Sequence, residues 1–202
     1  MQIYYYYSLM SPWAYFGAPR LYELQKKHGF IINHYPLDIL KLFTLSGGIP
    51  LAKRADQRKI YRMMELKRWQ KKLNLPINFM PKYFPPSDVS KASCMILSIK
   101  DPKIQNDLSF SLLQNVWVEE KDIGDQNTLI EVCNNLGLNS EEMFEQASTK
   151  EKLYHSLADE AAKLNIFGSP SYVLKEEVFW GQDRLDLLEE ITTETRVVDY
   201  EV

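Results

Sequence analysis

The order of apolar and polar positions at the start of the chain predicts a strand, a helix and a second strand. Residues 2–8 form an aromatic-rich run, QIYYYYS, of a composition that favours strands. Ser11 and Pro12 then supply a capping residue followed by proline in the first helical turn, and the helical pattern continues to a stop at Gly29. Residues 30–36 (FIINHYP) again favour a strand. A right-handed parallel βαβ unit is the expected closure.

The middle of the chain predicts helices joined by loops. Residues 45–50 (LSGGIP) favour a loop, and a basic helix is expected over about 52–74. The four prolines of residues 75–86 exclude a regular helix there. Several further helices follow over residues 87–164, and the first of them is expected to open on a serine cap at Ser87.

Strand patterns return only near the end. Residues 170–174 and 178–180 predict a hairpin that turns at 175–177, Gly181 breaks it, and a last helix opens at Gln182-Asp183. Strands at both ends of the chain, around a helical block of roughly a hundred residues, predict an α/β fold. We expect one sheet built from the two termini, with the helices inserted between them.

Composition narrows the possible partners. The 202 residues are 45% hydrophobic, and 24 basic against 27 acidic residues leave a formal net charge of -3. This near balance gives no general reason to expect nucleic acid or a membrane surface as a partner. No apolar run approaches the roughly 20 residues of a membrane span, and no secretory signal pattern opens the chain, so a cytoplasmic location is expected. Cys94 and Cys133 form no CxxC pair, and with three scattered histidines they offer no metal-ligand spacing.

Ser11 is the first candidate for chemistry. Unpaired amide groups and the helix dipole favour an anion at a helix start, and a hydroxyl there can donate to it. A thiolate is such an anion, because helix N-termini lower thiol pKa values. Serine is also among the preferred helix caps, so a purely capping role is the alternative.

Three further places could bind a ligand. A cis peptide at Ser169-Pro170 would leave the backbone of Ser169 free to pair with an extended ligand, although an ordinary trans proline in a loop is the alternative. Gln182 and Asp183 could hold a carboxylate or an ammonium group at the last helix, or only start that helix. Lys53, with Arg54 and Arg58 close by, suits an acidic ligand, or else forms a solvated face.

Read together, these motifs resemble one family. Ser-Pro-Trp-Ala after the first strand, Gly-Ser-Pro before a late strand and Trp-Gly-Gln-Asp-Arg-Leu before the last helix occur in a single order. The chain resembles the 2-hydroxychromene-2-carboxylate isomerases and kappa-class glutathione transferases, in the DsbA-like branch of the thioredoxin superfamily. The resemblance covers nearly the whole chain, and its clearest segments are 4–15, 67–79 and 167–188.

The resemblance implies a thioredoxin-like fold with an inserted all-helical domain. The thioredoxin-like part would comprise residues 1–50 and 160–202, and the helical insertion residues 51–159. Redox members of the superfamily carry Cys-Pro-x-Cys where this chain has Ser11-Pro12-Trp13-Ala14. Both thiols are missing, which excludes dithiol–disulfide exchange at this turn.

The resemblance also implies roles for individual residues, with glutathione as the cofactor. Ser11 would be catalytic, donating a hydrogen bond to the glutathione sulfur, and Ser169, before cis-Pro170, would pair with its cysteinyl backbone. Gln182 and Asp183 would hold the glutamyl end, and Lys53 would lie near the glycyl carboxylate.

Pro12 and Trp13 would line the pocket of a small aromatic or conjugated electrophile. We expect a glutathione-dependent isomerase, with a kappa-class-like transferase as the alternative, which lysine at position 53 favours. A thioredoxin-fold oxidoreductase or a non-redox binding protein that retains the fold are the other hypotheses. The resemblance further implies a homodimer.

Overall fold

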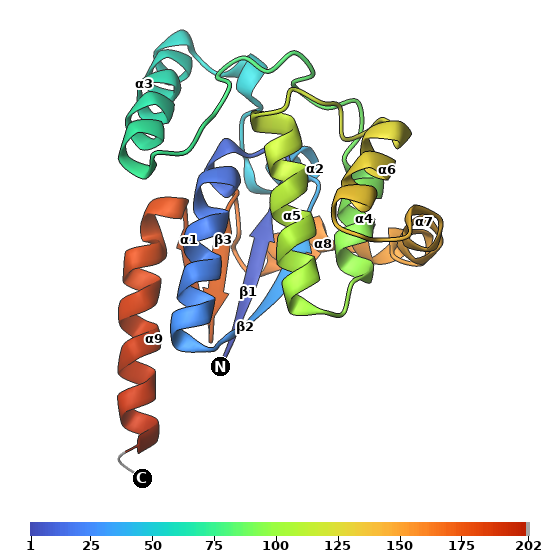
Figure 1. Ribbon diagram of the computed structural model, residues 1–202. Helices are drawn as coiled ribbons and strands as arrows, with labels where there is room; N and C mark the ends of the chain where they lie inside the picture. The colour runs from blue at the N-terminus through green and yellow to red at the C-terminus, as the bar shows by residue number, and fades with distance from the viewer. Residues whose placement is uncertain (201–202) are drawn as a thin grey trace.

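A computed structural model describes the backbone of residues 1–200 and the side chains of residues 1–193. Strands and helices follow the order strand–helix–strand, a helical block, a hairpin and a final helix (Figure 1). The elements are β1 (Gln2–Tyr7), α1 (Pro12–His28), β2 (Ile31–Pro36), α2 (Ile39–Ser46), the 3-10 helix η1 (Leu51–Lys53), α3 (Asp56–Leu73), α4 (Ser90–Ser98), α5 (Pro102–Trp117), α6 (Gln126–Asn135), α7 (Ser140–Ser148), α8 (Glu151–Lys163), β3 (Ser171–Leu174), β4 (Glu177–Trp180), the 3-10 helix η2 (Gln182–Arg184) and α9 (Leu185–Tyr200).

The four strands form one mixed sheet in the order β2-β1-β3-β4. β1 pairs in parallel with β2 and antiparallel with β3, and β3 pairs antiparallel with β4. Tyr5, for example, lies between His34 of β2 and Tyr172 of β3. The prediction of a single sheet built from the two ends of the chain is therefore confirmed.

Alternation along β1 divides the apolar side chains between the two faces of the sheet. Ile3, Tyr5 and Tyr7 belong to the larger core, which lies against α1, α5 and α9. Tyr6 belongs to a second core against α2 and α8. The tyrosine run is thus a core strand, as its composition predicts.

A buried polar chain runs from β1 to α5. The Tyr7 hydroxyl lies 3.1 Å from His34 Nδ1 and 2.7 Å from the Ser109 hydroxyl. His34 Nε2 lies 2.8 Å from the Asn106 side-chain oxygen, while the Asn106 amide nitrogen donates to Gln25 at 2.8 Å. Because Asn106 presents its oxygen, His34 donates through Nε2 and accepts the Tyr7 proton at Nδ1. Burial lowers the pKa of His34 to about 4, although the bond to Asn106 acts in the opposite direction.

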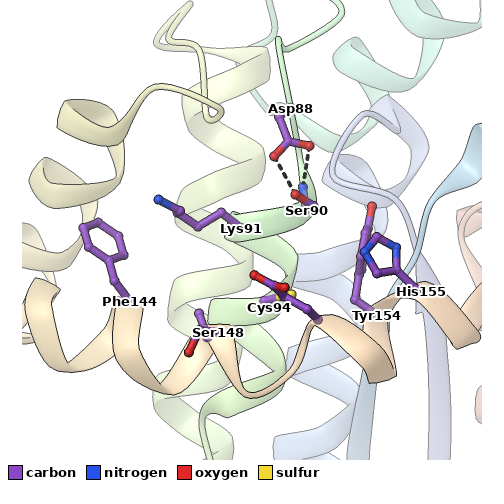
Figure 2. Close-up of a pocket in the computed structure, with 10 residues that line it drawn as sticks. Asp88, Ser90, Lys91, Cys94, Phe144, Ser148, Tyr154 and His155 are labelled. Atoms are coloured by element: carbon purple, nitrogen blue, oxygen red, sulfur yellow. Dashed lines mark hydrogen bonds between the residues drawn. The ribbon is translucent and has the colours of Figure 1, made fainter.

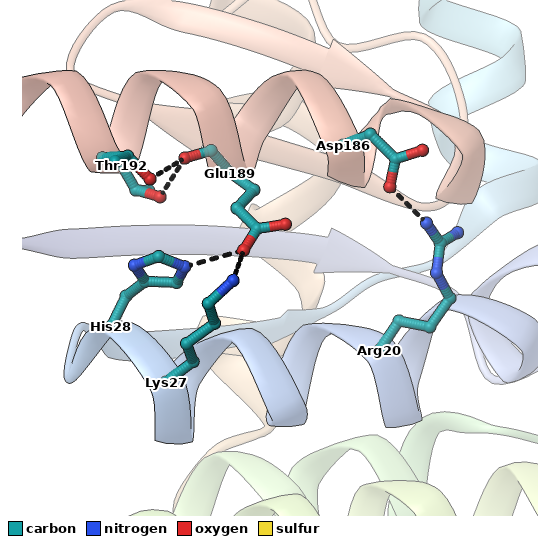
Figure 3. A network of polar contacts seen from close by, with 7 residues as sticks. Arg20, Lys27, His28, Asp186, Glu189 and Thr192 are labelled. Carbon is teal, nitrogen blue, oxygen red and sulfur yellow. Dashed lines mark hydrogen bonds and ion pairs between the residues drawn. The ribbon is translucent and has the colours of Figure 1, made fainter.

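Ion pairs attach the first part of α9 to α1 (Figure 3). Glu189 Oε1 accepts from Lys27 Nζ at 2.6 Å and pairs with His28 Nε2 at 2.9 Å. Arg20 pairs with Asp186 at 2.7 Å, one turn earlier on α9. Residues 192–202, which match no motif in the sequence, include the end of α9, and positions 201–202 lie outside the described residues.

Several predicted boundaries were wrong. Residues 45 and 46 belong to α2, a helix that the sequence pattern did not predict, so the loop begins at Gly47. The basic helix expected over 52–74 is divided into η1 and α3, because Arg54 adopts an extended backbone between them. The hairpin turn is shorter than expected, since β4 begins at Glu177.

The serine cap expected at Ser87 is also wrong. Helix α4 begins at Ser90, and its N-cap residue, Val89, has no side-chain oxygen. The Asp88 carboxylate accepts from the Ser90 amide at 3.0 Å instead. The expected stop at Gly29 is confirmed, because Gly29 has φ 65 and its amide donates to Gln25.

Candidate functional site

The turn between β1 and α1 carries Ser11 at a helix N-cap. Ser11 has an extended backbone, and its hydroxyl oxygen accepts from the Ala14 amide at 3.2 Å. The same hydroxyl donates to the Ser169 carbonyl oxygen at 3.1 Å. The side chain is only 8% exposed, so it acts in a largely desolvated setting. Ser11 therefore caps the helix and at the same time contacts the second predicted site.

The Ser169-Pro170 peptide is cis, which confirms the geometry that the family resemblance implies. The Ser169 hydroxyl accepts from the Ser8 amide at 2.8 Å, and the Pro170 carbonyl accepts from the Gly181 amide at 2.9 Å. Two serines of the β1–α1 turn thus hold the residue before the cis-proline. The structure brings Ser11, Ser169 and Pro170 into one unit, although they are far apart in sequence.

Close packing explains the glycine before this unit. A Cβ atom built on Gly168 would lie 2.3 Å from the indole nitrogen of Trp180. Trp180 packs edge-to-face on Phe167, with ring centroids 4.6 Å apart. Both rings are about half exposed, so an aromatic surface borders the cis junction.

Gln182 and Asp183 lie in η2, just beyond β4. Gln182 is buried, and Arg20 Nη1 donates at 2.8 Å both to its side-chain oxygen and to its carbonyl oxygen. Since arginine only donates, the amide nitrogen of Gln182 is the group left for a ligand. Asp183 is partly exposed and pairs with Arg184 at 2.9 Å.

The remaining predicted residues lie on neighbouring elements. Pro12 is buried in the first turn of α1, whereas Trp13 is half-buried, packs on the larger core and has its ring centroid 6.2 Å from that of Phe16. Lys53 is exposed at the end of η1, and its ammonium group makes no hydrogen bond or ion pair with any described residue. No contact given by the structure joins Lys53 to Ser11.

The two cysteines lie outside this site. Cys94 is buried in α4 at the base of a cavity of about 310 Å³ between α4, α7 and α8 (Figure 2). Burial, with a smaller contribution from Glu151 and Asp88, raises the pKa of the Cys94 thiol to about 11. Burial also raises the pKa of Cys133. Both thiols stay protonated near neutral pH, which agrees with their prediction as small buried apolar residues.

Arg20 is a residue that the sequence analysis missed. It lies in α1 and orients both Gln182 and Asp186 through contacts across more than 160 positions of sequence. Arg20 belongs to no recognisable sequence motif, so only the packing of α1 against η2 and α9 reveals its role.

The strand order, the N-capped serine turn and the cis-proline before β3 define a thioredoxin-fold protein whose active turn lacks both redox cysteines. The sequence matches the DSBA-like thioredoxin domain family over residues 2–192. The chain therefore belongs to that family.

Three comparisons describe its relatives. The chain is 28% identical over 188 residues to a 2-hydroxychromene-2-carboxylate isomerase of Sphingobium xenophagum, covering 92% of this chain and 94% of the relative. It is 23% identical to the human glutathione S-transferase kappa 1, covering 91% of this chain and 87% of the relative. A solved 2-hydroxychromene-2-carboxylate isomerase superposes with a TM-score of 0.86 at 20% identity, covering 100% of this chain and 98% of the other.

These relatives are isomerases and a glutathione transferase, so the chain belongs to a family that includes enzymes. Separately, no helix within residues 1–200 combines the length and the apolar character needed to cross a bilayer.

Proposed function

We propose that this protein is a glutathione-dependent isomerase of the 2-hydroxychromene-2-carboxylate isomerase type. The observation that carries the proposal is the contact between the Ser11 hydroxyl and the Ser169 carbonyl at the start of α1. It places the only hydroxyl of the Ser-Pro-Trp-Ala turn beside the backbone that would bind an extended tripeptide. The relatedness to named isomerases supports the same conclusion.

In this proposal glutathione exchanges one hydrogen bond for another. Its cysteinyl N–H donates to the Ser169 carbonyl, which the Ser11 hydroxyl occupies in the free protein. The Ser11 hydroxyl then donates its hydrogen bond to the glutathione sulfur instead, while its oxygen still accepts from the Ala14 amide. A charge-assisted bond of this kind contributes about 1.5–3 kcal/mol, and the helix N-terminus adds to it. Together they would lower the pKa of the thiol by about two.

The other residues hold the ends of the tripeptide. Gln182, oriented by Arg20, presents its amide nitrogen to the glutamyl carboxylate, and Asp183 accepts from the glutamyl ammonium group. Lys53 lies near the glycyl carboxylate. Pro12 and Trp13 line the place of the conjugated aromatic substrate.

The chemistry needs no redox step. Bound glutathione would supply a thiolate that adds reversibly to the conjugated substrate, permits rotation about the former double bond and is released unchanged. Ser11 and the start of α1 would keep that sulfur anionic, and the Ser169 backbone would orient it.

A kappa-class-like glutathione transferase is the second candidate. Lys53 favours it, because by resemblance the transferases carry lysine at that position, and the human relative supports it. A transferase consumes glutathione in proportion to product, whereas an isomerase leaves the glutathione concentration unchanged. A homodimer and a cytoplasmic location stay predictions from the family resemblance.

Substitution of Ser11 tests the proposal. Ser11→Gly removes the hydroxyl but keeps a residue that helix N-caps tolerate, and Ser11→Thr keeps both the hydroxyl and the cap. We expect Ser11→Gly to lower glutathione-dependent turnover of 2-hydroxychromene-2-carboxylate by about 10- to 100-fold, and Ser11→Thr to retain most of it. The pKa of bound glutathione, followed by thiolate absorbance, should rise in the glycine variant.

Free thiol is measured in the same assays. Equal turnover in wild type and Ser11→Gly would remove Ser11 from the mechanism. Loss of thiol in step with product would favour the transferase. Absence of binding of millimolar glutathione in calorimetry would refute the proposed function and favour a non-redox binding protein that retains the fold.

A further inference from the structure

The cavity beside Cys94 lies apart from the Ser11 turn. It has a volume of about 310 Å³ and is lined mainly by residues of α4, α7 and α8 (Figure 2). Small-molecule pockets usually measure about 300–1,000 Å³, so this cavity has room for a small ligand. Ser11, Ser169 and Gln182 do not line it. A molecule the size of an amino acid can therefore occupy it without using the proposed glutathione site.

The floor of the cavity is apolar. Cys94 and Ala147 are each 2% exposed, and Tyr154 is 4% exposed. Figure 2 shows Phe144 on one side of Cys94 and Tyr154 on the other. Because a polar group placed on such a floor would lose water without gaining a partner, the floor favours an aliphatic group.

A carboxylate at the rim of the cavity has no partner. The side chain of Glu151, the first residue of α8, forms no hydrogen bond or ion pair with any described residue. Burial is the main cause of the raised pKa of the Cys94 thiol and the charge of Glu151 is the next, so this carboxylate acts on the floor. Asp88, the other carboxylate at the rim, already accepts from the Ser90 amide at 3.0 Å and from the Ser90 hydroxyl at 2.5 Å. Glu151 is therefore the group left to accept from a ligand.

A cation at the rim also lacks a counter-charge. Lys91 of α4 places its ammonium nitrogen 5.1 Å from the centre of the Phe144 ring and forms no ion pair with any described residue. Lys91 and Glu151 both line the cavity, yet they are not paired with each other. Two opposite charges above one apolar floor match a molecule that carries both charges and an apolar group.

We propose that this cavity binds a small zwitterion, an α-amino acid with an apolar side chain. The ammonium group of the ligand pairs with Glu151, its carboxylate pairs with Lys91, and its side chain covers Cys94 and Ala147. Both ion pairs lie at an exposed rim, so the affinity is expected in the millimolar range. The site is additional to the proposed function and does not depend on it.

Four ligands that differ in one group test the proposal. L-Leucine carries both charges and a branched apolar side chain. Isocaproate lacks the ammonium group, isoamylamine lacks the carboxylate, and glycine lacks the side chain. Amide chemical-shift changes in NMR titrations of the full chain give the Kd and the position of each ligand, with and without saturating glutathione. We expect leucine to shift amides of α4, α7 and α8 and to bind more tightly than the other three.

Charge variants at the rim assign each group of the ligand. Glu151→Gln should raise the Kd of leucine and of isoamylamine about three- to tenfold without weakening isocaproate. Lys91→Gln should weaken leucine and isocaproate to a similar degree without weakening isoamylamine. The matched controls are Glu145→Gln and Lys152→Gln, because these exposed charges of α7 and α8 do not line the cavity. Neither control should change the Kd of leucine.

Four results would overturn the proposal. The first is the absence of shift changes in α4, α7 and α8 at tens of millimolar leucine. The second is equal weakening of leucine in the rim variants and in the controls, and the third is equal affinity for leucine and glycine. The fourth is displacement of leucine by glutathione, which would place leucine at Gln182 and Asp183. Failure of glutathione to bind would refute the proposed function instead and would leave the leucine titrations as decisive as before.

Discussion

The buried imidazole of His34 should make the stability of this protein depend on pH. His34 is 3% exposed, and both of its ring nitrogens have partners on neighbouring elements. Burial lowers its pKa from 6.5 to about 4 in the folded state. Since a pKa difference of one corresponds to 1.36 kcal/mol, the neutral form of His34 accounts for about 3 kcal/mol of pH-dependent stability.

The sign follows from which state binds the proton. The unfolded chain protonates His34 near pH 6.5, whereas the folded protein resists protonation until about pH 4. The contribution of His34 to the free energy of unfolding is therefore fully present above pH 6.5 and falls by about 3 kcal/mol as the pH decreases toward 4. Protonation would also convert Nδ1 from an acceptor into a donor, so the hydrogen bond that it accepts from the Tyr7 hydroxyl would be lost.

Urea unfolding at several pH values between 7 and 4 measures this effect in the wild type, in His34→Gln and in the control His155→Gln. His155 is exposed on α8, so its replacement should leave the pH dependence unchanged. His34→Gln should be less stable than the wild type at pH 7 and should lose about 3 kcal/mol less on acidification. An identical loss of stability in wild type and His34→Gln would refute the reasoning.

Two further predictions concern the packing and the attachment of α1. Gly17→Ala should lower the free energy of unfolding by about 1–2 kcal/mol, because the added Cβ would lie 2.6 Å from the Tyr172 hydroxyl. Urea unfolding of the double variant with Tyr172→Phe should show most of this loss recovered. If the effects of the two substitutions on the free energy of unfolding simply add, the explanation is wrong. Glu189→Gln should cost about 0.5–1 kcal/mol at pH 7, since Lys27 and His28 both lower the pKa of Glu189 from 4.5. That stability is present above pH 4.5 and lost as the pH falls through the lowered pKa, so the difference between the wild type and Glu189→Gln should shrink as the pH falls below 4.5. A difference that stays constant over that range would refute the ion-pair explanation.

Local patterns predicted the elements that carry strong local signals. The aromatic run of β1, the serine–proline start of α1 and the glycine that ends it act through neighbouring residues, so they can be recognised in sequence. Helix α2 was missed, although Asp38 caps it and Gly47 ends it in a left-handed conformation. The helix has only eight residues and most of them are apolar, and the sequence pattern of such a short apolar run does not distinguish a helix from a buried strand or the end of a loop.

The candidate site likewise contains residues that local sequence patterns predicted and residues that they did not. Ser11 and the Ser169-Pro170 junction were predicted, since a helix cap and an X-Pro peptide are local features. Arg20 was not, because its importance comes from its contact with Gln182, which lies 162 residues later in the chain. A basic residue on a helix looks the same in sequence whether it faces solvent or a buried partner.

The sequence by itself determined that a serine, and no cysteine, begins the first helix, and that strands form the two ends of the chain. Only the tertiary structure decided that this hydroxyl meets the Ser169 carbonyl, 158 residues away, and that Arg20 orients Gln182, 162 residues away. The reason is physical: caps and strand propensities act over a few residues, whereas desolvation and the pairing of distant polar groups exist only once the chain has packed.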